Sequence, residues 1–164
     1  MLHIIGLGLN ERGYSREAYD TISKAGFIYV DNYTVDFPYN LKELSSQFKG
    51  KKFLIADRDI IESFKLLEKA KGKNIVLLVY GSPLTATTHI SLVEEAKKRK
   101  IKVKIIHSAS VLDAAAETGL QLYKFGKIAS MPGFEADSYM EIVNSNLSIN
   151  AHTLVLIDIG MDFE

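Results

Sequence analysis

The segment Ile75-Val-Leu-Leu-Val-Tyr-Gly-Ser-Pro-Leu-Thr-Ala-Thr-Thr-His89 decides the fold class of this chain. Its first six residues are apolar or aromatic, which predicts a strand buried on both faces of a parallel sheet. The run breaks at Gly81-Ser82-Pro83, and a threonine-rich stretch then leads into a helix. A strand that feeds a helix through a tight turn exposes backbone N–H groups at the carboxyl edge of the sheet, where open α/β sheets bind ligands. We therefore expect the functional site at this edge.

Short apolar runs alternate with longer amphipathic ones along most of the chain, as in repeated βαβ units. The predicted strands are residues 3–8 (with their turn), 27–30, 52–56, 75–80 and 101–106. The predicted helices are residues 15–24, 41–48, 59–71, 88–99 and 110–117, with Ser15 and Asp59 as caps of the first and third. This pattern predicts an α/β fold with a five-stranded parallel sheet and helices on both faces.

The rhythm changes after Gly126, where residues 128–131 run into the strong turn signal Pro132-Gly133. A helix near 137–146 and a final strand at 153–159 follow. We expect an N-terminal α/β domain over residues 1–127. We expect residues 128–164 to be a linker, a helix and the first strand of a truncated second α/β domain.

Composition excludes several classes of function. The chain has 164 residues, 20 basic and 20 acidic, so no electrostatic footprint predicts binding to nucleic acid or an anionic membrane. It has no cysteine, which removes disulfides and thiolate chemistry. No apolar run approaches the roughly 18 residues of a membrane span, and no signal peptide precedes the first strand. We expect a soluble, cytoplasmic protein.

Two patterns near the first strand invite a dinucleotide interpretation. Gly6-Leu-Gly8 follows the strand, and Asp31 ends the next one, where a ribose-binding acid would lie. The full fingerprint needs a small residue at position 11, which is Glu11. The glycines are better explained by a tight turn, and nicotinamide binding is kept only as a minor alternative.

The four histidines, His3, His89, His107 and His152, have no spacing typical of a metal site. His107 ends the fifth strand, where a hydrogen-bonded structural role is the favoured interpretation. The threonines of residues 85–88 could simply cap the following helix. From the residues alone we infer an α/β domain with a ligand cleft near residues 6–10, 81–88 and 107–111.

The same segments carry a family resemblance. The blocks are Ile5-Gly-Leu-Gly-Leu9, Tyr33-Thr34, Gly81-Ser-Pro-Leu-Thr-Ala-Thr-Thr-His89, Ile106-His-Ser-Ala-Ser-Val111 and Thr118-Gly-Leu-Gln-Leu-Tyr-Lys-Phe-Gly126. In this order they resemble the diphthine synthases, a branch of the tetrapyrrole methylase-like methyltransferases.

The resemblance implies an S-adenosylmethionine-dependent methyltransferase. It implies methylation of the amino group of the modified histidine of translation elongation factor 2, a step of diphthamide biosynthesis. It implies a dimer and no metal. The implied cofactor contacts are Leu9, Ser82, Thr85, Ser110, Val111 and Ile157. No catalytic side chain can be named.

Two departures from the family leave alternatives open. The family usually has Asp where this chain has Ser82, and its members have a complete second domain that this chain lacks. One interpretation is half of a split enzyme, active with a separate C-terminal polypeptide or weakly active alone. The other is a non-catalytic binding module that keeps the fold without turnover. The final apolar strand would lack a partner in its own chain, so we expect residues 150–161 to lie at an oligomer interface.

Overall fold

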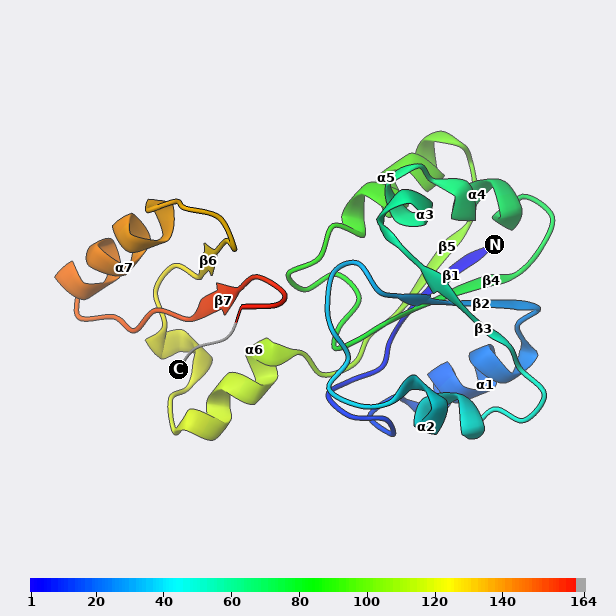
Figure 1. The fold of residues 1–164 in the computed structure, drawn as a ribbon, viewed down its shortest axis with the longest axis horizontal. Coiled ribbons are helices and arrows are strands. Elements are labelled where there is room, and N and C mark those ends of the chain that lie inside the picture. The colour runs from blue at the N-terminus through cyan, green and yellow to red at the C-terminus, as the bar shows by residue number, and fades with distance from the viewer. Residues whose placement is uncertain (162–164) are drawn as a thin grey trace. The chain divides into compact units, whose positions relative to one another are not determined.

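The computed structural model describes residues 1–161, so the last three residues of the predicted second domain lie outside it. The chain divides into two compact units, Met1–Ser110 and a second that begins at Val111 (Figure 1). Each is described by itself. The predicted domain boundary at residue 127 stays a prediction, which limited proteolysis can test.

The first unit is built on a five-stranded parallel sheet, as predicted. Its strands lie in the order β3-β2-β4-β1-β5, and every neighbouring pair is parallel. The strands are β1 (Leu2–Gly6), β2 (Phe27–Asp31), β3 (Phe53–Ala56), β4 (Ile75–Val79) and β5 (Val103–Ile106). The central strand β4 is buried at every position, as its unbroken apolar run indicates.

Helices cover both faces of this sheet (Figure 1). They are α1 (Arg16–Lys24), α2 (Leu41–Ser46), α3 (Arg58–Glu62), α4 (Lys65–Ala70) and α5 (Ile90–Lys98). Ile4 and Leu77 belong to the core under α3, α4 and α5. Ile5 and Leu78 belong to the core under α1 and α2. Alternate residues of one strand therefore face two separate cores, which makes this a three-layer α/β unit.

Local signals set most of the helix ends. Ser15 caps α1 as predicted, and its Oγ accepts a hydrogen bond from the backbone N–H of Ala18 at 3.1 Å. The single helix predicted from Asp59 to residue 71 is wrong. Asp57 is the cap, and the chain breaks at Phe64, whose φ is +59°. The break produces two short helices, and Phe64 packs against the core shared by α3, α4 and α5.

The second unit contains a small parallel sheet. Its elements are α6 (Val111–Ala114), η1 (Ala115–Thr118), η2 (Leu122–Lys124), β6 (Ala129–Met131), α7 (Ser138–Ser148) and β7 (Val155–Ile157). The expectation that the last strand has no partner in its own chain is wrong, because β7 pairs in parallel with β6. The sequence did not predict β6 as a strand, because it is only three residues long and is followed at once by the Pro132-Gly133 turn signal.

Asn146 holds this second unit together. It is 3% exposed, and its side chain accepts from the N–H of Lys127 and donates to the carbonyl of Lys127 and to the Thr153 hydroxyl, all within 3.0 Å. A Cβ at Gly126 would lie 2.3 Å from the Asn146 Oδ1. Glycine is thus required where the chain passes the amide, and α7 is tied to both segments that form the sheet.

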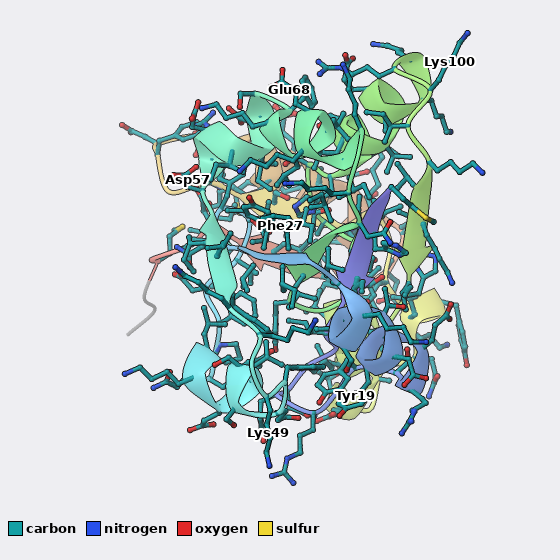
Figure 2. The ribbon with its side chains drawn as sticks, turned by 90° about the vertical axis from the view of Figure 1, so that its right-hand side faces the viewer. Tyr19, Phe27, Lys49, Asp57, Glu68 and Lys100 are labelled. Atoms are coloured by element: carbon teal, nitrogen blue, oxygen red, sulfur yellow. The ribbon has the colours of Figure 1, made fainter. Side chains whose placement is uncertain are left out.

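Charged side chains such as Glu68 and Lys100 point outward from the first unit (Figure 2). Near the end of α5, Lys97 and Lys98 are exposed, and Arg99 is paired with Glu95 at 2.8 Å. Within residues 1–161, no helix is long and apolar enough to cross a membrane.

Candidate functional site

The topology places a switch point at the carboxyl ends of β1 and β4. These strands are neighbours, but the chain leaves β1 toward α1 on one face and leaves β4 toward α5 on the other (Figure 1). Adjacent strands whose connections diverge in this way form the switch point at which open α/β sheets bind ligands. The two loops are the ones that the sequence predicted as functional.

The two loops are joined just beyond the strand ends. Gly8 and Gly81 form an antiparallel bridge, with backbone N–H···O distances of 3.2 and 3.0 Å. Both have a positive φ, +73° and +71°. A Cβ at Gly6 would lie 2.6 Å from the Gly81 carbonyl oxygen. Close approach of the loops therefore explains these glycines, and the dinucleotide fingerprint is not needed to account for them.

Leu9 is held at this edge through its backbone. The Tyr80 hydroxyl donates to the Leu9 carbonyl at 3.1 Å, and burial raises the pKa of Tyr80, so the phenol stays a donor. The Tyr80 ring packs edge-on against Phe37 and Tyr39, with centroids 5.8 and 6.1 Å away. This aromatic cluster fixes the backbone where the resemblance implies a cofactor contact.

Ser82 and Thr85 form a turn after Gly81, in which the N–H of Thr85 donates to the Ser82 carbonyl at 3.2 Å. Both residues are partly exposed. Within the described residues, no hydrogen bond uses either hydroxyl group. The threonines do not cap α5, which has no side-chain cap, and the Thr87 hydroxyl donates to the Pro83 carbonyl at 3.0 Å. The turn thus presents two hydroxyls at the carboxyl edge of the sheet.

Ser110 lies close to the same turn. A Cβ on Gly81 would be 3.8 Å from its Cα, and Ser110 is 5% exposed. Ser108, from the same segment, donates to the Gly13 carbonyl at 2.9 Å and ties this segment to the loop after β1. The first unit therefore brings Leu9, Ser82, Thr85 and Ser110 to one edge. The other two predicted contacts, Val111 and Ile157, belong to the second unit, where both are exposed.

The histidine that the structure singles out is not the one that the sequence indicated. His107 is exposed at the end of β5, and its side chain makes no hydrogen bond within residues 1–161, contrary to the expectation of a hydrogen-bonded structural role. His89 is completely buried, with its Nε2 3.5 Å from an Asp31 carboxylate oxygen. Asp31 is also completely buried and accepts hydrogen bonds from Tyr33 and Thr34, so it is not available to a ribose.

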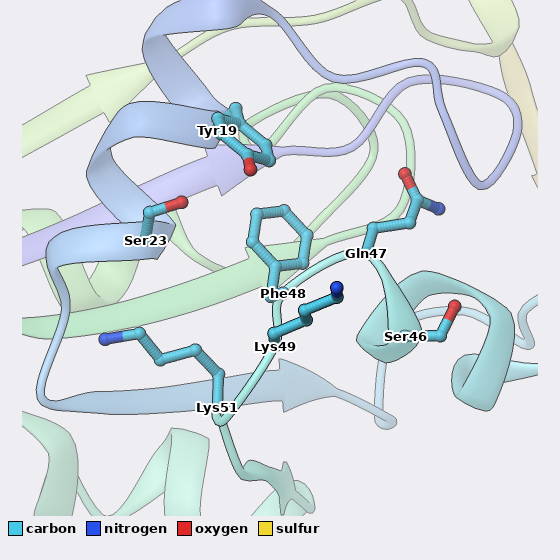
Figure 3. Close-up of a pocket in the computed structure, with 7 residues that line it drawn as sticks. All are labelled: Tyr19, Ser23, Ser46, Gln47, Phe48, Lys49 and Lys51. Atoms are coloured by element: carbon cyan, nitrogen blue, oxygen red, sulfur yellow. The ribbon is translucent and has the colours of Figure 1, made fainter.

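A pocket of about 450 Å³ lies elsewhere, between α1 and the segment after α2 (Figure 3). Two of its polar side chains already have partners on other segments. Lys51 donates to the Ala25 carbonyl at 2.7 Å, and Gln47 bonds to the Glu11 carbonyl at 2.8 Å. These contacts give the pocket a structural explanation. Among the described residues, no cluster of His, Asp or Glu could hold a metal ion.

Comparison with known proteins agrees with this geometry. The model of the family Tetrapyrrole (Corrin/Porphyrin) Methylases matches residues 1–161. The diphthine methyl ester synthase of Candida glabrata is 40% identical over 97% of this chain and 56% of its own length. The diphthine synthase of Archaeoglobus fulgidus is 37% identical over 97% of this chain and 64% of its own.

A solved diphthine synthase structure superposes with a TM-score of 0.91 at 35% identity, over 99% of this chain and 66% of that one. The predicted fold and the predicted resemblance to diphthine synthases are both confirmed. The chain spans only 55–58% of the length of the first four curated relatives that it matches. With its family match extending over nearly every residue, this chain belongs to the tetrapyrrole methylase family.

Proposed function

We propose that this chain is the cofactor-binding part of an S-adenosylmethionine-dependent methyltransferase of the diphthine synthase type. One observation carries the proposal. In a member of the methylase family, the switch point between β1 and β4 gathers Leu9, Ser82, Thr85 and Ser110 at one edge. Val111 and Ile157, the other two residues of the proposed contact set, belong to the second unit.

The residues at this edge suit such a donor. The hydroxyls of Ser82 and Thr85 have no other hydrogen bond within residues 1–161 and can serve the polar groups of the nucleoside or its amino acid. Leu9 offers apolar surface for a base at the same edge of the first unit. S-adenosylmethionine supplies a methyl group that is already electrophilic, so the chain's task is to align donor and acceptor, which can be worth several kcal/mol.

The acceptor that we propose is the modified histidine of translation elongation factor 2, methylated on its amino group. The names of the relatives add a second possibility for the atom that is methylated. The Candida glabrata relative is a diphthine methyl ester synthase, and an ester forms on a carboxylate oxygen. Mass spectrometry of the product before and after mild alkali distinguishes the two, because alkali removes an ester methyl and leaves an N-methyl group.

The second candidate function is a non-catalytic binding module. It is favoured by Ser82 in the place of the aspartate expected from the family resemblance. We further propose a cytoplasmic location and either a homodimer or a complex with a separate C-terminal half. These proposals follow from the role of elongation factor 2 and from the exposed apolar side chains of the second unit, such as Ile157 and Ile159.

A calorimetric titration with S-adenosylmethionine, with and without a homologous second domain, tests the function. We expect saturable binding that strengthens when the second domain is present, together with methyl transfer to elongation factor 2. Binding without transfer in the completed complex would support the non-catalytic module. Failure to bind S-adenosylmethionine in both conditions would refute a methyltransferase and a module that depends on this cofactor. An NADH fluorescence titration would then test nicotinamide binding.

A further inference from the structure

The buried pair His89 and Asp31 is not used by the proposed function. Asp31 is the last residue of β2, and His89 is the residue just before α5. Both side chains are 0% exposed, and the imidazole Nε2 lies 3.5 Å from the Asp31 Oδ2. An ionisable pair without contact with water requires a physical explanation, because burial of such groups opposes folding.

Asp31 is already committed to the turn that follows β2. Its Oδ1 accepts from the N–H of Tyr33 at 3.0 Å and from the N–H of Thr34 at 3.4 Å, and its Oδ2 accepts from the Thr34 hydroxyl. These bonds fix the orientation of the carboxylate. The side of the Oδ2 that remains faces His89, so the carboxylate presents a fixed acceptor to the imidazole.

His89 faces the Asp31 carboxylate from another segment of the chain. Burial lowers its pKa, and the Asp31 carboxylate and the Pro83 carbonyl oppose that effect by favouring a proton on the ring. The imidazole is therefore neutral at pH 7, with one N–H. Neither nitrogen meets hydrogen-bond geometry in the structure, and the contact of Nε2 with Asp31 is a longer polar one. This contact links the end of the loop that contains Ser82 and Thr85 to the end of β2.

A purely packing role does not explain this histidine. An aliphatic side chain of similar volume would fill the space and leave no polar atom unpaired. Each buried polar group without a partner costs about 1–3 kcal/mol. His89 also does not cap α5, since its side chain makes no cap hydrogen bond. The imidazole adds a polar contact of defined orientation, which connects the loop to Asp31.

The loop itself needs such an anchor. Its first residue, Gly81, is fixed by the bridge to Gly8, and its last is His89. Between them Ala86 has a φ of +54°, a left-handed conformation that costs about 1–2 kcal/mol for a residue with a Cβ. Strain of this kind persists only when the surrounding contacts determine the backbone. The bridge and the histidine contact restrain the two ends.

We propose that His89 is a positioning residue, which through its contact with Asp31 holds the loop of residues 82–88 in the shape that receives the methyl donor. The inference rests on the proposed function for the identity of the donor. The anchoring of the loop does not depend on the proposed function and can be measured without any ligand.

Amide hydrogen exchange tests the anchor directly. The variants are His89→Leu, which fills the site without polar atoms, and His89→Gln, whose amide can donate near the position of Nε2. We expect the amides of residues 84–88 to exchange at least tenfold faster in His89→Leu than in the wild type, and His89→Gln to restore much of the protection. His3→Gln, at the opposite end of the sheet, is the matched control and should leave the loop unchanged. Unchanged loop exchange in His89→Leu would overturn the proposal.

Binding of S-adenosylmethionine to the same proteins separates this inference from the proposed function. We expect the Kd to rise about tenfold in His89→Leu and to be partly rescued in His89→Gln. If the wild type and His89→Leu bind S-adenosylmethionine with equal affinity, the positioning role of His89 is refuted and the proposed function of the chain is not affected. No binding by the wild type would refute the function while the exchange result still decides the anchor. If His89→Leu does not fold, Asp31→Asn replaces it in both measurements with the same expectations.

Discussion

Ser82 is the residue at which this chain departs from the Asp expected from the family resemblance. It lies in a turn that presents its hydroxyl group at the carboxyl edge of the sheet. A hydrogen bond to a charged group is worth about 1.5–3 kcal/mol, roughly ten- to a hundredfold in affinity. We therefore predict that Ser82→Asp tightens binding of S-adenosylmethionine by this factor, measured by calorimetry. Ser82→Asn, which is polar but uncharged, is the control; weaker or unchanged binding in Ser82→Asp would contradict the account.

Two histidines, the buried His89 and the partly buried His3, predict a dependence of stability on pH. Burial is the largest cause that lowers the pKa of His89 and of His3 below 6.5, with Asp31 opposing the effect at His89 and Lys104 reinforcing it at His3. The unfolded chain thus binds more protons just below pH 6.5, so stability should fall as the pH drops below that value. Each histidine can contribute a slope of at most about 1.4 kcal/mol per pH unit.

Urea unfolding between pH 5 and 8 measures this slope. His89→Gln and His3→Gln should each reduce it, and the double variant should reduce it further. A slope that is the same in the wild type and the double variant would show that other groups cause the acid sensitivity.

At the residue scale, the sequence could place Ser82 and Asp31 at strand ends but could not reveal the pairing of Asp31 with His89. The two are 58 positions apart, and a pattern read along one chain says nothing about burial at a loop end. The signal available in the sequence was that β2 ends, and the loop after β4 begins, at the same edge of a parallel sheet. It would have directed attention to His89 rather than to His107.

At the scale of elements, the loop after β1 and the loop after β4 must approach closely. A Cβ at Gly6 would lie 2.6 Å from the Gly81 oxygen and 2.9 Å from the Pro83 Cδ, so Gly6→Ala should destabilise the first unit by about 1–3 kcal/mol and weaken donor binding. Gly26→Ala is the matched control, because a Cβ there meets nothing within 4 Å. Thermal unfolding and calorimetry check both effects; equal behaviour of the two variants would contradict the role assigned to the bridge.

In the second unit, it is the side chain of Asn146 that holds separate chain segments together. Asn146→Ala would leave the backbone N–H and carbonyl of Lys127 without their partner, at a cost of about 1–3 kcal/mol. Asn144→Ala, on the exposed side of the same helix, should change stability little. Urea unfolding compares them, and a loss in Asn144→Ala as large as in Asn146→Ala would argue against this contact network.

Periodicity predicted the strands of the main sheet and the position of its helices because their apolar runs are long. It failed where tertiary contacts decide. Phe64 interrupts a helix that its sequence would continue, since its ring packs into the core. The strand β6 has only three residues, too few for a pattern, and it exists because β7 lies beside it.

At the scale of the whole molecule, the edges of the small sheet and the apolar side chains near it predict association. Ile157 and Ile159 are 48% and 44% exposed, and the strand β7 pairs only with β6 within the described residues. We predict that residues 150–161 lie at an interface between two copies or with a separate C-terminal half. Light scattering at micromolar concentration should give twice the mass of one chain, and Ile159→Lys should reduce it. A monomer with this segment well ordered would contradict the prediction.

The central claim is that the methyl donor binds at the carboxyl edge between β1 and β4. Backbone NMR of the labelled protein, titrated with S-adenosylmethionine, tests it most directly. The account predicts shifts at Leu9, Ser82, Thr85 and Ser110, with those of residues 102–104, at the opposite end of the sheet, unchanged. Saturable shifts that cluster instead around the pocket lined by Tyr19 and Lys51, or no shifts with or without a second domain, would contradict it.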